Sequence, residues 1–290
     1  MHSTMQVIVK VAPAALILMM VGMGMCLTKA DFVRIVRYPK AVVAGSLMQF
    51  LLIPVVGYLL VLIFQMRPEL AVGFMILAAC PGGPGSNLVA FMCRGDAALS
   101  VSLTVVSSLY TIITIPIIIQ VSLDAFAQNE NAVQVSVIRS GLTMLVLAVL
   151  PIAFGMIINR YKPELAKKMV KPVKVASLVL LLLLVAAVFV KQGAILFDYI
   201  RECGIVGYAL CFITMGSGYI IARVLGLPEY QKRSISIEVG IQNGAMAVVI
   251  ATTLLENQAM AIPAIVYSPV MISVSFVLIV VTWITRHGLD

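Results

Sequence analysis

The residues best suited to bind a ligand in this 290-residue chain stand in two short polar stretches within apolar sequence. The first, "CPGGPGSN", runs from Cys80 to Asn87 and ends in a hydroxyl and an amide. The second, "EVGIQNG", runs from Glu238 to Gly244 and contains a carboxylate and two amides. Oxygen atoms of these types are hard ligands, so the stretches favour a hard cation such as sodium. Whether they can act together depends on the elements that position them.

The composition places both stretches in a membrane. Mean hydropathy is +1.10, and only 11% of the residues are charged, which is unlike a soluble domain. We therefore expect an all-α integral membrane protein in which residues 1–290 form a single domain, because the apolar runs are long enough to cross a bilayer and their connections are short. Nine spans are predicted, at residues 6–27, 41–64, 70–92, 97–122, 133–158, 173–190, 203–225, 234–254 and 261–285.

Basic residues are distributed unevenly between the two sides of this arrangement. Fifteen of the 20 lysines and arginines fall on one side, and the others are Lys10, Arg67, Arg139, Lys191 and Arg201. Cytoplasmic loops retain positive charge, so we expect a multi-pass protein of the cell (inner or plasma) membrane with its N-terminus outside and its C-terminus in the cytoplasm. The net charge of +8 then needs no nucleic-acid partner, and no obligatory protein partner is implied.

Each polar stretch interrupts a span. Two prolines and three glycines in the first stretch cannot all lie in a regular helix. At about 1.5 Å per residue, Glu238 lies roughly 7 Å and Asn243 about 15 Å beyond Arg233. From the opposite side, Pro81 lies about 16 Å beyond Leu70. The two breaks are thus expected at a similar depth, in spans of opposite direction within an inverted repeat of four plus five spans, a pattern that indicates a transporter site.

Other polar residues are weaker signals. A carboxylate within a membrane, such as Glu238, by default marks an ion or substrate pathway, whereas a lone amide such as Gln49 more often joins neighbouring helices. Hydroxyls at helical spacing share one face of span 97–122, and although each alone would be expected to bond to its own helix, together they suggest a wall of oxygens. These hydroxyls belong to Ser100, Thr104, Ser107, Ser108 and Thr111.

Catalytic and zinc-binding motifs are missing from the sequence. The only histidines are His2 and His287, near the two chain ends, and the five cysteines have no zinc or disulfide spacing. We therefore do not expect an enzyme. Half-helix N-termini at the breaks would instead present N–H groups to an anion, beside oxygen ligands for a cation. This combination indicates a cation-coupled anion transporter.

The two stretches, with "RGDAALSVSLT" between them, resemble the bile acid:sodium symporter family in order and spacing over nearly the whole chain. The resemblance is to bacterial-type members, without the first helix of ten-helix relatives. It implies a core domain, residues 41–122 and 203–285, around two broken crossing helices, and a panel domain, residues 6–27 and 133–190. Alternating access would come from movement of the core against the panel.

The resemblance also implies two sodium sites. The first would consist of Ser86, Asn87, Ser100, Thr104 and Glu238. The second would consist of Gln49, Glu238, Gln242 and the main-chain carbonyls of Val239 and Ile241. Because Glu238 would serve both sites, two bound sodium ions leave a surplus of about one positive charge, which attracts an anionic substrate.

The substrate is less well defined than the coupling ion. Asn243 follows the sodium residues and is the best candidate for a substrate contact. Pro84, beside Gly85, stands where bacterial relatives often have threonine, and Val270 and Met271 replace a polar pair of bile-acid-binding relatives. We expect sodium-coupled symport of an organic anion, either a bile-acid-like steroid or a small keto or hydroxy acid.

Two alternatives stay open at this point. The chain could be a proton-coupled or uncoupled organic anion carrier on the same fold, with Glu238 as the proton site. It could also be a sensor or scaffold that transports nothing. The intact set of ion ligands argues against the second alternative, because a scaffold has no need of a buried carboxylate.

Overall fold

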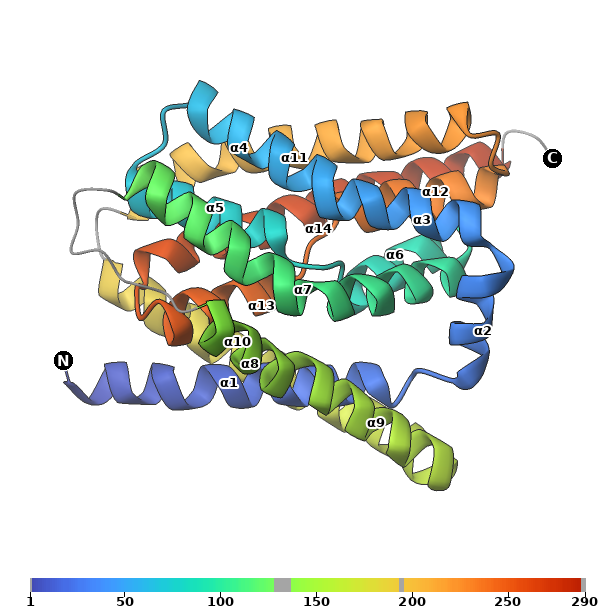
Figure 1. The fold of residues 1–290 in the computed structure, drawn as a ribbon, viewed down its shortest axis with the longest axis horizontal. Coiled ribbons are helices and arrows are strands. Elements are labelled where there is room, and N and C mark those ends of the chain that lie inside the picture. Colours follow the sequence, from blue (N-terminus) through green and yellow to red (C-terminus); the bar gives the residue numbers. More distant parts are fainter. Residues whose placement is uncertain (1, 128–136, 193–195, 288–290) are drawn as a thin grey trace.

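The computed structural model in Figure 1 describes residues 2–127, 137–192 and 196–287. Within these residues the chain is helical, and the only β-type pairing is a single antiparallel bridge between Gly82 and Gln242. The expected all-α membrane fold is confirmed. Residues 133–136, at the start of the fifth predicted span, lie outside the described residues.

The helices follow one another with short connections. The first part of the chain forms α1 (His2–Gly24), α2 (Lys29–Arg37), α3 (Pro39–Leu47), the π-helical turn η1 (Met48–Leu52), α4 (Ile53–Ile63), α5 (Pro68–Ala79), α6 (Pro84–Met92) and α7 (Ala97–Phe126). The middle forms α8 (Val137–Met144), the π-helical turn η2 (Leu145–Val149), α9 (Leu150–Tyr161) and α10 (Pro163–Gln192). The last part forms α11 (Leu196–Val224), α12 (Glu229–Gly240), α13 (Gly244–Val249), the turns η4 (Ile250–Leu254) and η5 (Ala259–Ala261), and α14 (Ile262–His287).

Five helical segments among the described residues are long and apolar enough to cross a membrane singly, and a sixth appears if the bent pair α1 and α2 counts as one span. The predicted spans 70–92 and 234–254 are not among them, because each is divided into shorter helices. Helices nevertheless follow in the order of the nine expected spans, and that number stays a prediction. The connection between the first two spans is itself helical and forms α2.

Local sequence explains both interruptions. Cys80, the residue before a proline, is extended and ends α5, while Pro84 begins α6. In the second break, Ile241 is extended after α12. Asn243 then starts α13 by accepting a hydrogen bond from the backbone of Met246 at 3.0 Å. The prolines and the cap residue therefore stop and restart the two helices where the sequence predicts.

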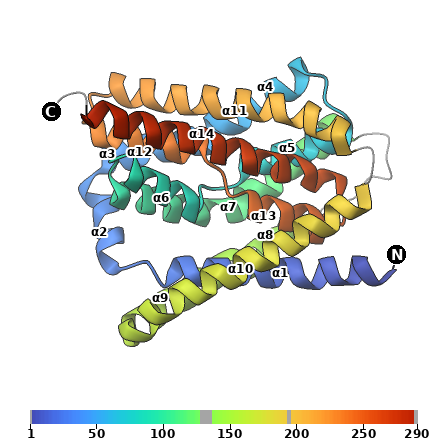
Figure 2. The same ribbon diagram turned by 180° about the vertical axis from the view of Figure 1, so that it is seen from behind.

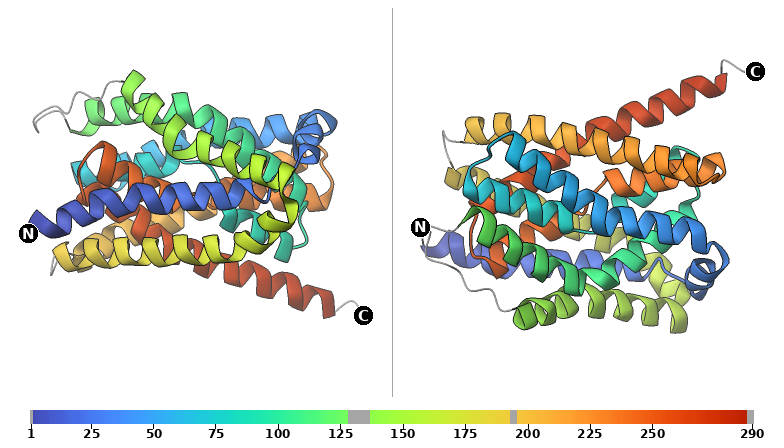
Figure 3. Two further views of the ribbon diagram at one scale, coloured as in Figure 1. Left: turned by 90° about the horizontal axis from the view of Figure 1, so that it is seen from below. Right: turned by 45° about the horizontal axis from the view of Figure 1, so that its top comes forward.

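The helices fall into two groups. Helix α1 packs against α9 and α10, and these three lie together on one side of the molecule in Figures 1 and 2. Helix α11 packs against α12 and α14 on the other side, and the right-hand view of Figure 3 shows α11 and α9 at opposite edges of the molecule. The division into panel and core domains, and their relative movement, stay predictions.

Candidate functional site

The two helix breaks meet in the structure. The backbone N–H of Asn243 donates to the carbonyl of Pro81 at 2.8 Å, and the bridge between Gly82 and Gln242 lies beside this bond. The expectation that the breaks lie at a similar depth is confirmed. Extended backbone inside a membrane needs partners, and each break supplies them to the other.

Glu238 lies at this crossing and is fully buried. Ser100 Oγ donates to Glu238 Oε2 at 2.6 Å, and Thr104 Oγ1 donates to Glu238 Oε1. The same hydroxyls approach the side-chain oxygen of Asn87, at 2.8 Å from Ser100 and 3.2 Å from Thr104. Each hydroxyl has one proton but faces two side-chain acceptors, so acceptor lone pairs outnumber protons here. A cation satisfies such a surplus.

Ser86 belongs to the same cluster. A Cβ atom added to Gly82 would overlap the Glu238 carboxylate and would lie 3.2 Å from Ser86 Oγ. Only glycine therefore allows the backbone of the first break to lie against this carboxylate. Ser86 Oγ donates to the carbonyl of Gly83 at 2.7 Å. The structure thus brings together all the residues of the first predicted sodium site, which are Ser86, Asn87, Ser100, Thr104 and Glu238.

No cationic side chain of the described residues forms an ion pair with Glu238. The ion pairs of the described residues involve other carboxylates, those of Glu202, Glu164 and Glu229. A buried carboxylate without a compensating charge is costly in free energy. Oxygen-rich surroundings without sulfur or imidazole fit sodium, so the residues present suit the predicted ion.

The second predicted site is assembled in part. Gln242 Nε2 donates to the carbonyl of Val239 at 2.8 Å, which joins two of the predicted ligands. Among the described residues, Gln242 Oε1 is buried without a hydrogen-bond partner, as are both amide atoms of Gln49 on η1. Ile241 contributes extended backbone at the break. Buried amides normally have partners, so the two amide oxygens are available to a cation or a water, whereas Gln49 Nε2 can only donate to an acceptor such as water.

Three of the five α7 hydroxyls that were expected to form a wall of oxygens donate to backbone carbonyls of α7 itself. Ser107 and Ser108 donate to the carbonyl of Thr104 at 3.0 and 2.7 Å, and Thr111 donates to the carbonyl of Ser108 at 2.8 Å. Of the five hydroxyls, those of Ser100 and Thr104 form the described hydrogen bonds to Glu238. The part of the stripe that contacts Glu238 is therefore limited to Ser100 and Thr104.

The predicted substrate residues are distributed over two places. Asn243 is buried next to Gly83, where an added Cβ would lie 3.6 Å from its side chain, and Pro84 and Gly85 follow directly in α6. A Cβ added to the exposed Gly85 would meet no atom within 4 Å, so the space beside it is open. Val270 instead lies buried against Gly207 of α11. Met271 is half-buried against the apolar core.

Sequence analysis missed two residues that shape the crossing. Gly82 allows the close approach to Glu238 described above. Tyr267 of α14 is fully buried and donates its hydroxyl to the carbonyl of Gly240 at 2.5 Å, where α12 ends. A tyrosine in the apolar run "AIVYSPV" was a signal, because a buried phenol needs a hydrogen-bond partner.

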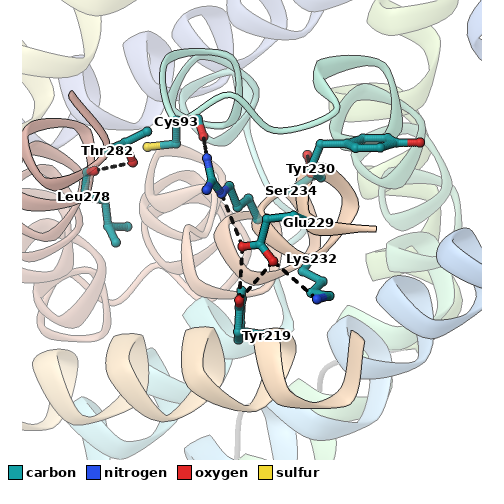
Figure 4. Close-up of polar contacts among 9 residues, drawn as sticks. Cys93, Tyr219, Glu229, Tyr230, Lys232, Ser234, Leu278 and Thr282 are labelled. Atoms are coloured by element: carbon teal, nitrogen blue, oxygen red, sulfur yellow. Dashed lines mark hydrogen bonds and ion pairs between the residues drawn. The ribbon is translucent and has the colours of Figure 1, made fainter. Parts of the chain in front are cut away.

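A polar network fixes the start of α12, as Figure 4 shows. The Tyr219 hydroxyl donates to both oxygens of Glu229 at 3.0 and 3.1 Å, and Arg233 Nε and Lys232 Nζ approach the same carboxylate at 3.4 and 3.3 Å. Partial burial opposes ionisation of Glu229, but these hydrogen bonds and charges together hold its pKa below the ordinary value. Arg233 also donates to the carbonyl of Cys93 at 3.3 Å, which ties α12 to the end of α6.

These features define a class of protein. Five of the described helical segments are apolar and of membrane length, and two broken helices cross beside a buried carboxylate. This is the architecture of a secondary transporter, in which discontinuous helices form the ion and substrate sites.

Comparison with known proteins identifies the family. A sequence model described as the Sodium Bile acid symporter family matches residues 13–199. The chain belongs to this family, and it is a multi-pass membrane protein.

Its relatives are named as cotransporters and transporters, not enzymes. They include the probable sodium/metabolite cotransporter BASS1, chloroplastic, of Arabidopsis thaliana, 32% identical over 86% of this chain and 61% of that protein. The uncharacterized sodium-dependent transporter YocS of Bacillus subtilis is 28% identical over 87% of this chain and 76% of that protein. The ileal sodium/bile acid cotransporter of Oryctolagus cuniculus is 31% identical over 79% of this chain and 65% of that protein. The chain thus spans less than two thirds of the plant and rabbit relatives.

Proposed function

We propose that this protein is a sodium-coupled symporter that imports an organic anion by alternating access. One observation supports this most strongly: the buried Glu238 carboxylate is surrounded by the oxygens of Ser100, Thr104 and Asn87, where acceptors outnumber protons. The names of several relatives include sodium coupling or sodium dependence, which agrees with this chemistry.

Two sodium ions bind in the proposed cycle, and they share Glu238. The first ion is held by Ser86, Asn87, Ser100, Thr104 and Glu238. The second ion is held by Gln49, Glu238, Gln242 and the carbonyls of Val239 and Ile241. With a monovalent anion, one net positive charge moves inward per cycle and gains about 2.3 kcal/mol per 100 mV of membrane potential.

The anion binds beside Asn243 and the open space at Gly85, where the surplus charge of the two ions is closest. Pro84 begins α6 there but has no N–H to donate, so anion recognition falls to neighbouring groups. The anion is either a bile-acid-like steroid or a small keto or hydroxy acid. Names of relatives include both bile acid and metabolite cotransporters.

In the proposed arrangement, the protein lies in the cell membrane with its N-terminus outside and its C-terminus in the cytoplasm. Movement occurs between the group formed by α1, α9 and α10 and the group around the crossing. Hydrogen bonds between the breaks support the idea that α5, α6, α12 and α13 move as one unit. The ion site is then exposed first to one side of the membrane and then to the other, while its residues stay together.

Uptake by purified protein in vesicles tests this function. Radiolabelled taurocholate and pyruvate serve as probes for the two substrate classes, with an inward gradient of sodium, of potassium, or of protons without sodium. We expect uptake of one probe to require sodium and to be lost in Thr104→Val, while Thr111→Val retains it. Uptake driven by the proton gradient alone would instead support proton coupling at Glu238.

A further inference from the structure

A cavity of about 460 Å³ lies away from the crossing, between α9 and the connection that leads from α1 to the first residue of α2. Its apolar part is formed by Leu27, Ala153, Met156 and Ile157. Ala153 and Ile157 are exposed, so the cavity opens sideways toward the surroundings of the helices. We call this cavity the α1–α9 pocket.

The walls of the α1–α9 pocket are held by direct contacts. Asn159 Nδ2 donates to the carbonyl of Leu27 at 2.8 Å. Below this bond, α1 and α9 approach closely at Gly24 and Gly155, where an added Cβ would overlap the carbonyl of Ile152 or of Val21. Small residues permit such close helix packing in membranes. The pocket is therefore preformed.

Helix α2 indicates the membrane level of the pocket. It is bent by 79° from α1, so it runs along the membrane surface if α1 crosses the bilayer. Its residues Val33 and Val36 are 65% and 79% exposed, as expected for a helix that lies on the lipid interface. Lys29, the first residue of α2, then lies at headgroup level. Ile157 and Ala153 precede Arg160 on α9 by about 5 and 10 Å, toward the acyl chains.

Two cations border this apolar space. Lys29 and Arg160 both line the pocket, and neither takes part in an ion pair found among the described residues. The guanidinium of Arg160 lies over the ring of Tyr161 at 5.4 Å. The nearby carboxylate of Asp31 accepts hydrogen bonds from the backbone and hydroxyl of Thr28 at 2.8 and 2.7 Å.

We propose that the α1–α9 pocket binds an anionic phospholipid of the surrounding leaflet. Its phosphate lies between Lys29 and Arg160, and its acyl chains lie along Ile157, Met156 and Ala153. Paired cations above a laterally open apolar wall match both parts of this ligand. Free phosphate would leave the apolar wall unused, and a zwitterionic headgroup brings its own cation. The proposal does not depend on sodium coupling, because the pocket shares no residue with the ion site.

Lipid-dependent thermal stability tests this proposal. The protein is purified in detergent, and its melting temperature is followed as phosphatidylglycerol, phosphatidylcholine or inorganic phosphate is added at constant ionic strength. We expect stabilisation by phosphatidylglycerol alone. In the double variant Lys29→Gln/Arg160→Gln, the half-saturating lipid concentration should rise roughly tenfold to thirtyfold, since each cation contributes about 1 kcal/mol.

Two further variants separate the pocket from general charge. Lys168→Gln/Lys171→Gln removes the same charge from exposed positions on α10 and should leave lipid binding within about twofold of wild type, since neither residue lines the pocket. Ala153→Phe keeps all charges but fills the apolar wall, and it should weaken the response to phosphatidylglycerol even if the first variant fails to fold. Equal loss in the α10 control, an unchanged response in the pocket variants, or equal stabilisation by inorganic phosphate would overturn the proposal.

Discussion

The backbone N–H of Asn243 lies 2.8 Å from the carbonyl oxygen of Pro81 and joins two helix breaks that are far apart in the sequence. Next to this bond, the Glu238 carboxylate lies against the backbone of Gly82. The position of the carboxylate therefore depends on the pairing of the breaks as well as on α12. Ion binding and the integrity of the crossing should respond together when either is changed.

Gly82→Ala tests this dependence. The added methyl group would overlap the Glu238 carboxylate and lie 2.7 Å from its carbon, so the carboxylate must move away from Ser100 and Thr104. We expect a loss of about 1–3 kcal/mol in the free energy of unfolding and no stabilisation by sodium. Thermal unfolding in sodium and in potassium measures both effects.

Gly216→Ala is the matched control for Gly82→Ala. Gly216 lies on α11, where an added Cβ meets no atom within 4 Å. The free energy of unfolding of Gly216→Ala should differ from that of wild type by less than about 1 kcal/mol. This variant should also keep the sodium response of wild type. If Gly82→Ala kept the full sodium response, the Glu238 carboxylate could not be held in place by this close approach.

Thr104→Val tests the role of the hydroxyls. The substitution removes an oxygen that contacts both Glu238 and Asn87 while nearly preserving volume. We expect the half-saturating sodium concentration to rise at least about tenfold, which corresponds to about 1.4 kcal/mol. Thr111→Val removes an equally buried hydroxyl that bonds only to its own helix in the described contacts, so it should stay within about twofold of wild type. Equal effects of the two variants would mean that the α7 stripe acts only through helix stability.

Glu229→Gln should lower stability in a pH-dependent way. The depressed pKa of Glu229 in the folded protein means that its ionised form is favoured by folding. This contribution is present above the unfolded pKa of about 4.3 and is lost as the pH falls through the lower folded pKa. The side chain is 48% exposed, so we expect about 1 kcal/mol or less near neutral pH.

Melting temperatures of wild type and Glu229→Gln from pH 7 downward test this sign. The two curves should converge below about pH 4. Glu164→Gln, which removes an exposed partner of Lys167, should follow wild type throughout. A difference between wild type and Glu229→Gln that grew on acidification would contradict the proposed network.

Local chemistry allowed the helix breaks to be predicted. The prolines and glycines of the first stretch cannot all lie in a regular helix, which predicted that break, whereas the start of α13 at Asn243 came from the structure alone. The family resemblance supplied the partners of Glu238, and the structure brings those of the first site together. These features depend on short stretches whose residue types admit few conformations.

Contacts between segments far apart in the sequence were harder to predict. For each hydroxyl on α7 a bond to its own helix was the expected default, but the sequence could not show which of the five depart from it, because that depends on how α7 is rotated against α12. The bond from Tyr267 to Gly240 joins α14 to α12 and depends on their packing. Helix α2 is too short for a hydropathy pattern to separate it from a loop. Such features follow from tertiary structure, which periodicity does not encode.

The most direct test is the melting temperature of wild type and Glu238→Gln in sodium against potassium at equal ionic strength. Sodium at about 100 times its dissociation constant should stabilise wild type by about 2.7 kcal/mol, and the isosteric amide should abolish this effect because it removes the charge shared by both proposed ions. Equal melting temperatures of wild type in the two salts would contradict sodium coupling at the crossing.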